Sequence, residues 1–394
     1  MNLIALPGAV ARETLSQYVE RGGYSGLARA REQGAAWTLG ELRRAGLRGR
    51  GGSGEGRPVA DKWAKVARAT GIAHYVIANG AESSIVSQKD RYLMARFPHR
   101  VLDGLLIACL ATGATEGYLY VRGDADEAVA GITAAVDEAG NAGLLEGVTV
   151  HVQTSLPGYI SGEETAVIDA LEGLEGLPQP KPPRPEEIGL KGCPTAVNNV
   201  ETLAAAAAIL RLGAEAFTAV GTPDCPGTAL FTVSGDVERP GVYELPYGTP
   251  LSELLALAGA GPDLLAVLPG GLSSGPLRPD ELDVPLTYED LAAVGSTVGP
   301  AAVVVFSQSS GNSFAALVAE NAGFLAEASC GQCKGCKEGN QTLAQALGAG
   351  NRDLALQYAQ TLLYGRGNCA HPTGAARFAL RSLQSFPEAW KGAR

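Results

Sequence analysis

The chain has 394 residues, of which 46% are hydrophobic and 18% are charged, and its formal net charge is −10. This length allows two or three domains with substantial cores, and the composition is that of an ordinary soluble globular protein. The negative charge argues against a nucleic-acid-binding surface. No apolar run reaches the roughly 20 residues that span a bilayer, and the start of the chain lacks the basic leader of a signal peptide. We therefore expect a cytoplasmic protein.

Helical and strand patterns alternate through the first half of the chain. Residues 11–46 have helical spacing and end in glycine, residues 73–83 contain a buried strand, and residues 87–114 are again helical. Short apolar strands within 116–124 and 147–155 enclose a helix at 124–140. This alternation predicts an α/β layer built on a mostly parallel sheet.

The pattern changes in the second half. A proline-rich crossing at 175–194 leads to a helical stretch at 198–217. Residues 228–249 read as two strands joined by a turn, followed by a short helix at 250–259 and strands within 264–271 and 301–307. This order favours a small β-grasp-like α+β domain. From residue 309 to the end the spacing is helical.

Seven cysteines occur, and four of them are gathered near the C-terminus. An odd number with this distribution is not a disulfide framework. Cys330, Cys333 and Cys336 form C-x2-C-x2-C, and Cys369 lies farther along. Three thiolates on one turn can reach three corners of a [4Fe–4S] cubane, which a fourth thiolate closes. Zinc is the alternative, although zinc sites more often use two separated C-x2-C knuckles.

A glycine-rich loop, LRGRGGSGEGRP, follows the first helical region. Its Gly49-x-Gly51-x-x-Gly54 spacing matches the dinucleotide fingerprint, but a helix precedes it where that fingerprint requires a strand. Bare backbone N–H groups and the charges of Arg48 and Arg50 nevertheless suit an anion. We therefore predict a phosphate-bearing cofactor here, with a flexible surface loop as the alternative.

Two further stretches carry polar groups beside helix starts. PGYISGEETA places Glu163 and Glu164 next to a glycine turn, and PTAVNNVETL places Asn198 and Asn199 before a helix. Such amides and carboxylates can bind a polar ring or ribityl hydroxyls. They can equally cap helices, which is the commoner role of asparagine in this position.

The order of these motifs resembles a known family. In chain order they are GLRGRGGSG, NGAESSIVSQKDR, GYISGEETA, KPPRP, PTAVNNVETL, VSGDVERPGVYELP, SCGQCKGCKEG and NCAHPTGA. This series resembles the flavoprotein subunit of NADH-quinone oxidoreductase (the F subunit of respiratory complex I) and its relatives in formate dehydrogenases and bidirectional hydrogenases. The resemblance covers nearly the whole chain.

The resemblance implies an α/β and α+β multidomain fold in three parts. These are a Rossmann-like FMN-binding domain with an N-terminal helical segment (1–225), a β-grasp, soluble-ligand-binding domain (226–308) and a helical [4Fe–4S]-binding domain (309–394). It implies cofactor-binding roles for Gly49, Arg50, Gly51, Gly52, Gly54, Lys62, Asn79, Tyr159, Gly162, Asn198 and Asn199. It implies a catalytic position at the flavin for Glu163 and Glu164, and cluster ligation by Cys330, Cys333, Cys336 and Cys369.

The chain departs from the family where the nicotinamide dinucleotide is expected to bind. Members of the family usually have aromatic residues at the positions of Glu55 and Arg184 in this chain. Both aromatic residues are expected to stack on the NADH adenine. Ala81 replaces an aspartate, Ser84 a glutamate and Ser161 a cysteine. Because stacking contributes roughly 1–3 kcal/mol per aromatic, NADH binding is expected to be weakened. Arg184 could instead stack or meet a phosphate, which would favour NADPH.

Three functions follow from these features. The first is an oxidoreductase subunit that passes electrons from NAD(P)H through FMN and the cluster to a partner iron–sulfur protein, thioredoxin-like [2Fe–2S] or ferredoxin-like. The second is an FMN and [4Fe–4S] electron-transfer module that has lost nicotinamide binding. The third is a scaffold that keeps the fold and a cluster or zinc. All three bring the chain to a membrane only through a larger complex.

Overall fold

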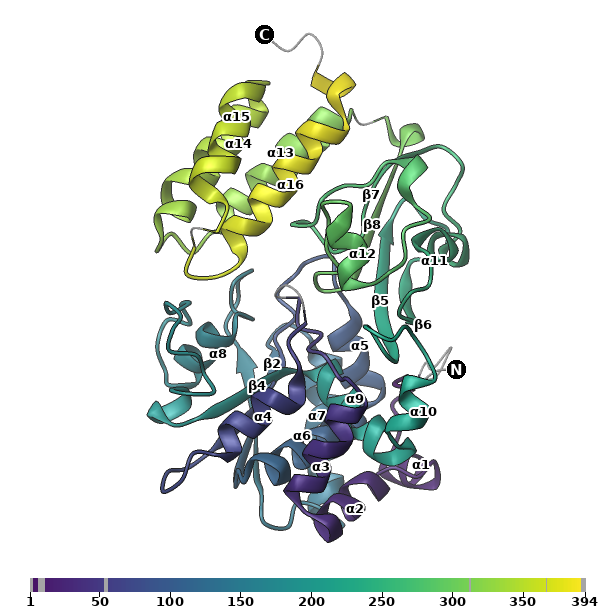
Figure 1. Ribbon diagram of the computed structural model, residues 1–394, viewed down its shortest axis with the longest axis vertical. Coiled ribbons are helices and arrows are strands. Elements are labelled where there is room, and N and C mark those ends of the chain that lie inside the picture. Colours follow the sequence, from purple (N-terminus) through teal and green to yellow (C-terminus); the bar gives the residue numbers. More distant parts are fainter. Residues whose placement is uncertain (1–2, 6–10, 53–55, 312, 366, 391–394) are drawn as a thin grey trace.

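The structure, a computed structural model, describes residues 3–5, 11–52, 56–311, 313–365 and 367–390 (Figure 1). Among these residues, no helix has both the length and the apolar character needed to cross a bilayer. The predicted N-terminal helical region is confirmed, but it is divided into α1 (Leu15–Glu20), α2 (Ser25–Gln33) and α3 (Ala35–Arg44). The breaks fall at Gly22 and Gly34, whose φ angles of +80° and +84° favour glycine and end a helix.

The first sheet is parallel throughout, as predicted. Its strands lie in the order β3-β2-β1-β4, with bounds Tyr75–Gly80 for β1, Glu116–Arg122 for β2, Thr149–Ser155 for β3 and Thr195–Asn199 for β4. The first three match the predicted strands. The sequence pattern did not predict β4, because its five residues contain no apolar run and pass directly into a helix. Since all four strands are parallel, their carboxyl ends meet at one edge, where β1 and β4 end in Asn79, Asn198 and Asn199.

Helices cover both faces of this sheet. They are α4 (Val59–Ala67), α5 (Lys89–Arg96), α6 (Pro98–Thr112), α7 (Asp126–Asn141), α8 (Glu164–Leu171) and α9 (Val200–Leu212). The short α10 (Ala214–Thr218) packs on α9 and α3 instead. The α6 and α9 helices are buried along almost their whole length and pack on each other. Gly104 of α6 permits this close approach, because a β-carbon there would collide with the carbonyl group of Leu203.

The second sheet has the strand order β6-β5-β8-β7. Its elements are β5 (Thr228–Gly235), β6 (Gly241–Pro246), α11 (Leu251–Ala258), β7 (Leu264–Leu268), α12 (Tyr288–Ala293) and β8 (Ala302–Ser307). The outer pairs are antiparallel, whereas β5 and β8 are parallel. The predicted hairpin, helix and later strands are thus confirmed as an α+β unit with a β-grasp-like arrangement.

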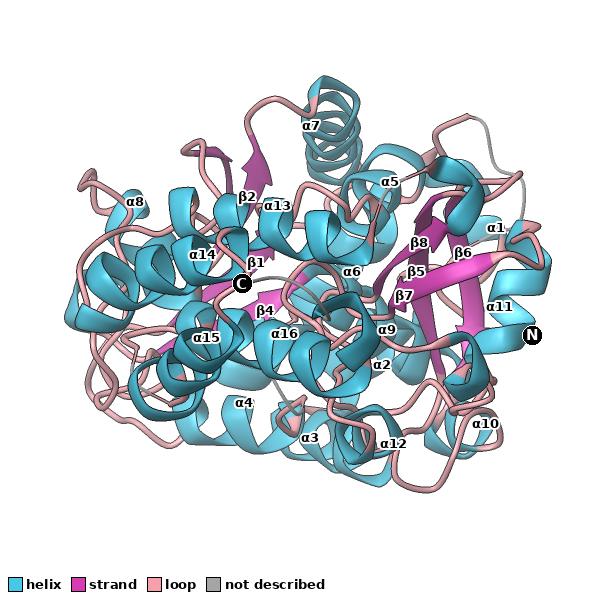
Figure 2. Ribbon diagram, turned by 90° about the horizontal axis from the view of Figure 1, so that it is seen from above, coloured by secondary structure: helices cyan, strands magenta, loops and turns pink. Residues whose placement is uncertain are grey.

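The C-terminal part is helical, as predicted. It consists of α13 (Phe314–Glu327), α14 (Gln341–Gly348), α15 (Arg352–Tyr358) and α16 (His371–Ser385), with wider π-turns at Gly335–Asn340 and Ala359–Leu363. The rings of Phe314 and Phe386 stack with centroids 3.9 Å apart, in an apolar core that these helices share with Ala266, Leu268 and Val304 of the second sheet. Figure 2 looks down on these helices and shows them in front of the parallel sheet, with the second sheet to one side.

We expect Gly104→Ala to lower the free energy of unfolding by about 1–3 kcal/mol, because the added methyl group forces α6 away from α9. Gly140→Ala is the matched control, since Gly140 is an exposed position of α7 where a β-carbon would make only an ordinary contact with Leu145. The control should be neutral or slightly stabilising. Urea unfolding of both variants measures the difference, and equal stability of the two would contradict this account of the helix contact.

Candidate functional site

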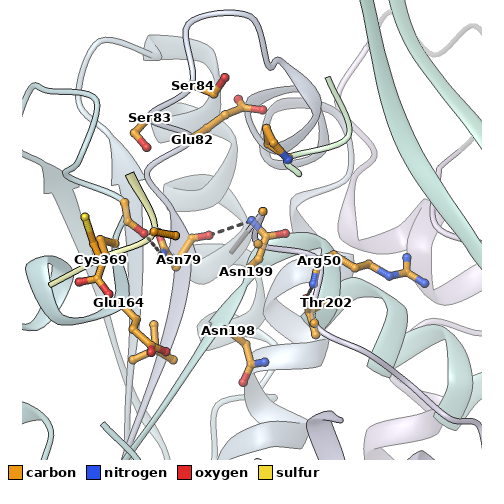
Figure 3. Close-up of a pocket in the computed structure, with 18 of the residues that line it drawn as sticks. Arg50, Asn79, Glu82, Ser83, Ser84, Glu164, Asn198, Asn199, Thr202 and Cys369 are labelled. Atoms are coloured by element: carbon orange, nitrogen blue, oxygen red, sulfur yellow. Dashed lines mark hydrogen bonds between the residues drawn. The ribbon is translucent and has the colours of Figure 1, made fainter. Parts of the chain in front are cut away.

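A cavity of about 550 Å³ opens at the carboxyl edge of the parallel sheet. Residues of the glycine-rich loop, the ends of β1 and β4, the start of α8 and the segment 367–370 line it (Figure 3). This volume suits a small-molecule cofactor, and ligands of open α/β sheets bind outside the carboxyl ends of the strands. Ser273 and Pro300 reach the cavity from the second sheet's part of the chain, so all three parts contribute to its wall.

The glycine-rich loop forms one side of this cavity through Gly49, Gly51 and Gly52. Gly54 lies outside the described residues. Gly52 has a φ of +83°, and a β-carbon there would come within 3.1 Å of the Pro300 backbone nitrogen. At Gly52, therefore, the backbone conformation and the close approach of Pro300 favour glycine over any larger residue. As expected from its context, it follows α3 instead of a strand of the sheet.

The side chain of Arg50 does not point into the cavity, in contrast to the expectation that it would add charge to a phosphate cradle. Figure 3 shows it extending away from the other labelled side chains. Its guanidinium donates to Glu201 at 3.1 Å, and its backbone N–H donates to Thr202 Oγ1 at 2.9 Å. Arg50 is 5% exposed, and a buried guanidinium requires such a carboxylate partner. The side chain supports the loop from behind.

Glu201 is the centre of a buried charge network beneath the cavity. Its Oε1 accepts from Arg50 and from the backbone N–H of Leu230 at 3.0 Å, while Oε2 lies 2.9 Å from Lys89 Nζ. Lys89 also donates to Asp90 at 2.7 Å. Burial lowers the pKa of Lys89, but Asp90 and Glu201 together raise it above its usual value, so the ammonium stays charged. Burial raises the pKa of Asp90 to about 6.

The three predicted asparagines lie together at the strand ends, all against the cavity. Asn79 Nδ2 donates to the Gly162 carbonyl at 2.8 Å, and Asn198 Oδ1 accepts from the indole N–H of Trp63 at 2.8 Å. Asn199 Oδ1 accepts from the Glu201 N–H at 3.0 Å and caps α9, while its Nδ2 donates to Asp90. The capping alternative is confirmed for Asn199.

The two predicted acids sit at the start of α8. Glu163 is the N-cap, accepting from the N–H groups of Thr165 and Ala166, and its other oxygen lies 2.6 Å from Lys181 Nζ. Glu164 lies 3.1 Å from Lys181 and 3.9 Å from Lys62. Both acids line the cavity but are neutralised by lysines. The sequence did not predict that Lys181 of the KPPRP motif pairs with these two acids. Residues that are 17 or 18 positions apart show no regular spacing in the sequence that would indicate such a pair.

Lys62 and Tyr159 complete the predicted set. Lys62 donates to the Val197 carbonyl at 2.8 Å, and burial lowers its pKa despite the nearby Glu164. The ring of Tyr159 lies against His371 and Phe324, with centroids 5.5 and 5.4 Å away. Since His371 follows Cys369 by two residues, Tyr159 connects the cavity wall to the cysteine-bearing helices.

Further residues of the NGAESSIVSQKDR motif line the cavity, among them Glu82 and Ser84. Glu82 has a φ of +37° and is held by the backbone N–H groups of Asp90 and Arg91, so its carboxylate caps α5. Ser84 lines the cavity, and its buried hydroxyl has no hydrogen-bond partner among the described residues. A ligand with a hydrogen-bonding group would satisfy this hydroxyl.

The structure brings Cys369 beside the other three cysteines, although it lies 33 residues after Cys336 in the sequence. Cys336 shares a hydrogen bond with Cys333 and interacts electrostatically with Cys369, which in turn interacts with Cys330. Burial raises the pKa of Cys369 to about 11, although the N–H of His371 opposes this. Burial also raises the pKa of Cys333, but N–H donors of Cys336 and Asn368 more than reverse this and favour its thiolate.

Two observations bear on what these thiols can hold. Within the described residues, no three His, Cys, Asp or Glu side chains are gathered as tightly as a single metal ion requires. Cys369 also lines the cavity, which places the cysteine group directly at its wall.

Three family profiles match the chain. The Nuo51 FMN-binding domain matches residues 42–208, the SLBB domain residues 230–275, and the NADH-ubiquinone oxidoreductase-F iron–sulfur binding region residues 316–392. The NADH-quinone oxidoreductase F subunit of Streptomyces coelicolor is 36% identical over 96% of this chain and 87% of its own length. The first of two such F subunits of Rhizobium meliloti is 38% identical over 83% of this chain and 78% of its own length.

Solved structures agree with these matches. A chain of an NAD⁺-reducing [NiFe]-hydrogenase in the air-oxidized state superposes with a TM-score of 0.81 at 33% identity. The superposition covers 91% of this chain but 63% of the hydrogenase chain, so this chain spans less than two thirds of that protein's length.

We expect Glu201→Gln to destabilise the protein by about 3 kcal/mol or more. Both carboxylate oxygens of Glu201 accept from donors. The NH₂ group of the new amide, which cannot accept a hydrogen bond, must therefore face either Lys89 or the N–H groups of Arg50 and Leu230. Glu238→Gln is the control, since Glu238 is exposed and pairs with its exposed neighbour Arg239. Chemical unfolding measures both, and a loss below 1 kcal/mol in the buried variant would contradict the role assigned to Glu201.

Proposed function

We propose that this chain, which belongs to the family of NADH-quinone oxidoreductase F subunits, is an oxidoreductase subunit that passes electrons from NAD(P)H through FMN and a [4Fe–4S] cluster to an iron–sulfur partner. One observation carries this proposal. The cavity bounded by the glycine-rich loop also has Cys369 in its wall. The proposed flavin and cluster sites thus adjoin, as short-range electron transfer requires.

The residues fit FMN. The bare backbone of Gly49, Gly51 and Gly52 suits a phosphate, and the amides at the strand ends suit a flavin ring or ribityl hydroxyls. When bound, FMN supplies the ability to take two electrons together and release them singly. The protein's own part is to position it. Hydrogen bonds hold three of these polar side chains in place before the cofactor binds. Asn79 is bonded to the Gly162 carbonyl, Lys62 to the Val197 carbonyl and Asn198 to the Trp63 indole.

Lys181 forms ion pairs with Glu163 and Glu164, and these pairs set the charge of the cavity wall where we propose that the nicotinamide binds. Glu163 and Glu164 would repel the phosphates of a dinucleotide, and Lys181 compensates both at 2.6 and 3.1 Å. Glu163 is further committed to the α8 N-terminus. Of the two acids, Glu164 is therefore the better placed to contact a substrate.

The proposed domain boundaries are 1–225, 226–308 and 309–394. They are supported by the second sheet, which begins with Thr228 and ends with Ser307, and by the change to helices from α13 onward. A thioredoxin-like [2Fe–2S] or ferredoxin-like subunit is the proposed electron acceptor. We propose a cytoplasmic location within such a complex.

Anaerobic titration of the cofactor-loaded protein tests the function. We expect NADH or NADPH to bleach the flavin absorbance, because either dinucleotide can deliver a hydride to it. Reduction with dithionite is the control for an intact flavin. If dithionite bleaches the flavin and neither dinucleotide does, the chain is an electron-transfer module without nicotinamide binding.

Removing Cys369 tests the cluster assignment. In Cys369→Ala we expect iron and acid-labile sulfide per chain to fall by more than half while bound FMN is retained, because only the fourth ligand is lost. Cys193→Ser, on the half-buried Cys193 outside the group, should leave both contents unchanged. Stoichiometric zinc without sulfide in the native chain would overturn the cluster assignment.

A further inference from the structure

A second cavity, of about 330 Å³, adjoins the first and shares Arg57, Lys62 and Arg184 with it. We call it the basic cavity, because its wall carries five cations, Arg57, Lys62, Lys65, Arg68 and Arg184. Two carboxylates, Asp61 and Glu186, share this wall. In a chain with a net charge of −10, an excess of three positive charges around one small cavity indicates an anionic ligand.

The carboxylates near this cavity are already engaged. Asp61 pairs with Arg43 at 3.2 Å outside the basic cavity, and Glu186 pairs with Arg57 at 2.6 Å. Lys65 pairs with Glu187 at 2.9 Å. The positive potential of the basic cavity therefore rests mainly on Lys62, Arg68 and Arg184. The last two are exposed, and Arg184 also interacts electrostatically with Glu187.

Arg184 is presented from an ordered turn. Its carbonyl accepts from the N–H of Glu187 at 2.8 Å, and its own N–H donates to the Glu187 carboxylate at 2.9 Å. A backbone held in this way reduces the entropy that the guanidinium loses when it binds a ligand. Arg184 also lines both cavities, so one elongated ligand could contact Arg184 and extend into both.

Glu186 adds a second, independent sign of a ligand. It is 2% exposed, and although Oε1 is paired with Arg57, Oε2 is buried without a hydrogen-bond partner among the described residues. A buried carboxylate oxygen in a cavity wall needs a donor, and a ligand hydroxyl can provide one. The wall thus offers cations for a phosphate and one acceptor for a neighbouring hydroxyl.

We propose, resting on the function proposed above, that the basic cavity binds the phosphorylated adenosine ribose of NADPH. The 2′-phosphate would meet the guanidinium groups of Arg68 and Arg184, and Glu186 Oε2 would accept from the neighbouring ribose hydroxyl. The nicotinamide end would then lie in the first cavity. The chain accordingly prefers NADPH to NADH.

Adenosine 2′,5′-bisphosphate and adenosine 5′-monophosphate test this site without requiring any electron transfer. Calorimetry on the FMN- and cluster-loaded protein should show at least tenfold tighter binding of the bisphosphate, since charged hydrogen bonds to phosphate are strong. In Arg184→Ala and Arg68→Ala the preference should fall at least fivefold. Arg239→Ala, on an exposed arginine of the second sheet's domain, should retain it. Equal binding of the two probes by the native protein would overturn the proposal.

Anaerobic reduction by each dinucleotide tests the proposed function and the ligand of the basic cavity separately. A lower half-saturating concentration for NADPH than for NADH, lost in Arg184→Ala and weakened by salt, supports both the function and the basic cavity. Reduction by NADH at equal or lower concentration overturns the basic cavity alone. Reduction by neither dinucleotide, with dithionite still effective, overturns the proposed function and the basic cavity with it.

Discussion

The arrangement of the site depends on one buried carboxylate, Glu201. It accepts from Arg50 in the glycine-rich loop, from Lys89 at the start of α5 and from the backbone of Leu230 in β5. Three segments that are far apart in the sequence are thereby tied to the first turn of α9. Because each partner is buried, none can exchange this contact for water without a large desolvation cost. The loop, the strand edge and the second sheet are held as one frame around the cavity.

This frame explains why the two faces of the cavity differ in character. Hydrogen bonds support the face formed by the loop and the strand ends. Trp63 donates to Asn198, Thr202 accepts from the Arg50 N–H, and Asn199 accepts from the Glu201 N–H. The face that includes Lys181 and Arg184 is built from surface turns and ion pairs. Substitutions are tolerated more easily on the second face, because changing an exposed side chain leaves few buried partners unsatisfied.

The helical C-terminal part closes the cavity and shares an apolar core with β7 and β8 of the second sheet. Its helices pack around Phe314 and Phe386, and the turn at 367–370 with the Cys369 side chain reaches the cavity wall. Tyr159 meets this part through the rings of His371 and Phe324. The turn that carries Cys369 thus brings the cysteine group to the cavity wall.

Local patterns in the sequence determined much of the fold. The apolar runs predicted seven of the eight strands that the described residues form, and cysteine spacing grouped Cys330, Cys333 and Cys336, because periodicity and close spacing are properties of neighbouring residues. The sequence did not reveal β4, the pairing of Lys181 with Glu163, or the direction of the Arg50 side chain. Each of these depends on a partner far along the chain. Only the tertiary structure placed Glu201 behind Arg50, Cys369 at the cavity and five cations around a second cavity, because burial and charge pairing are decided when distant segments meet.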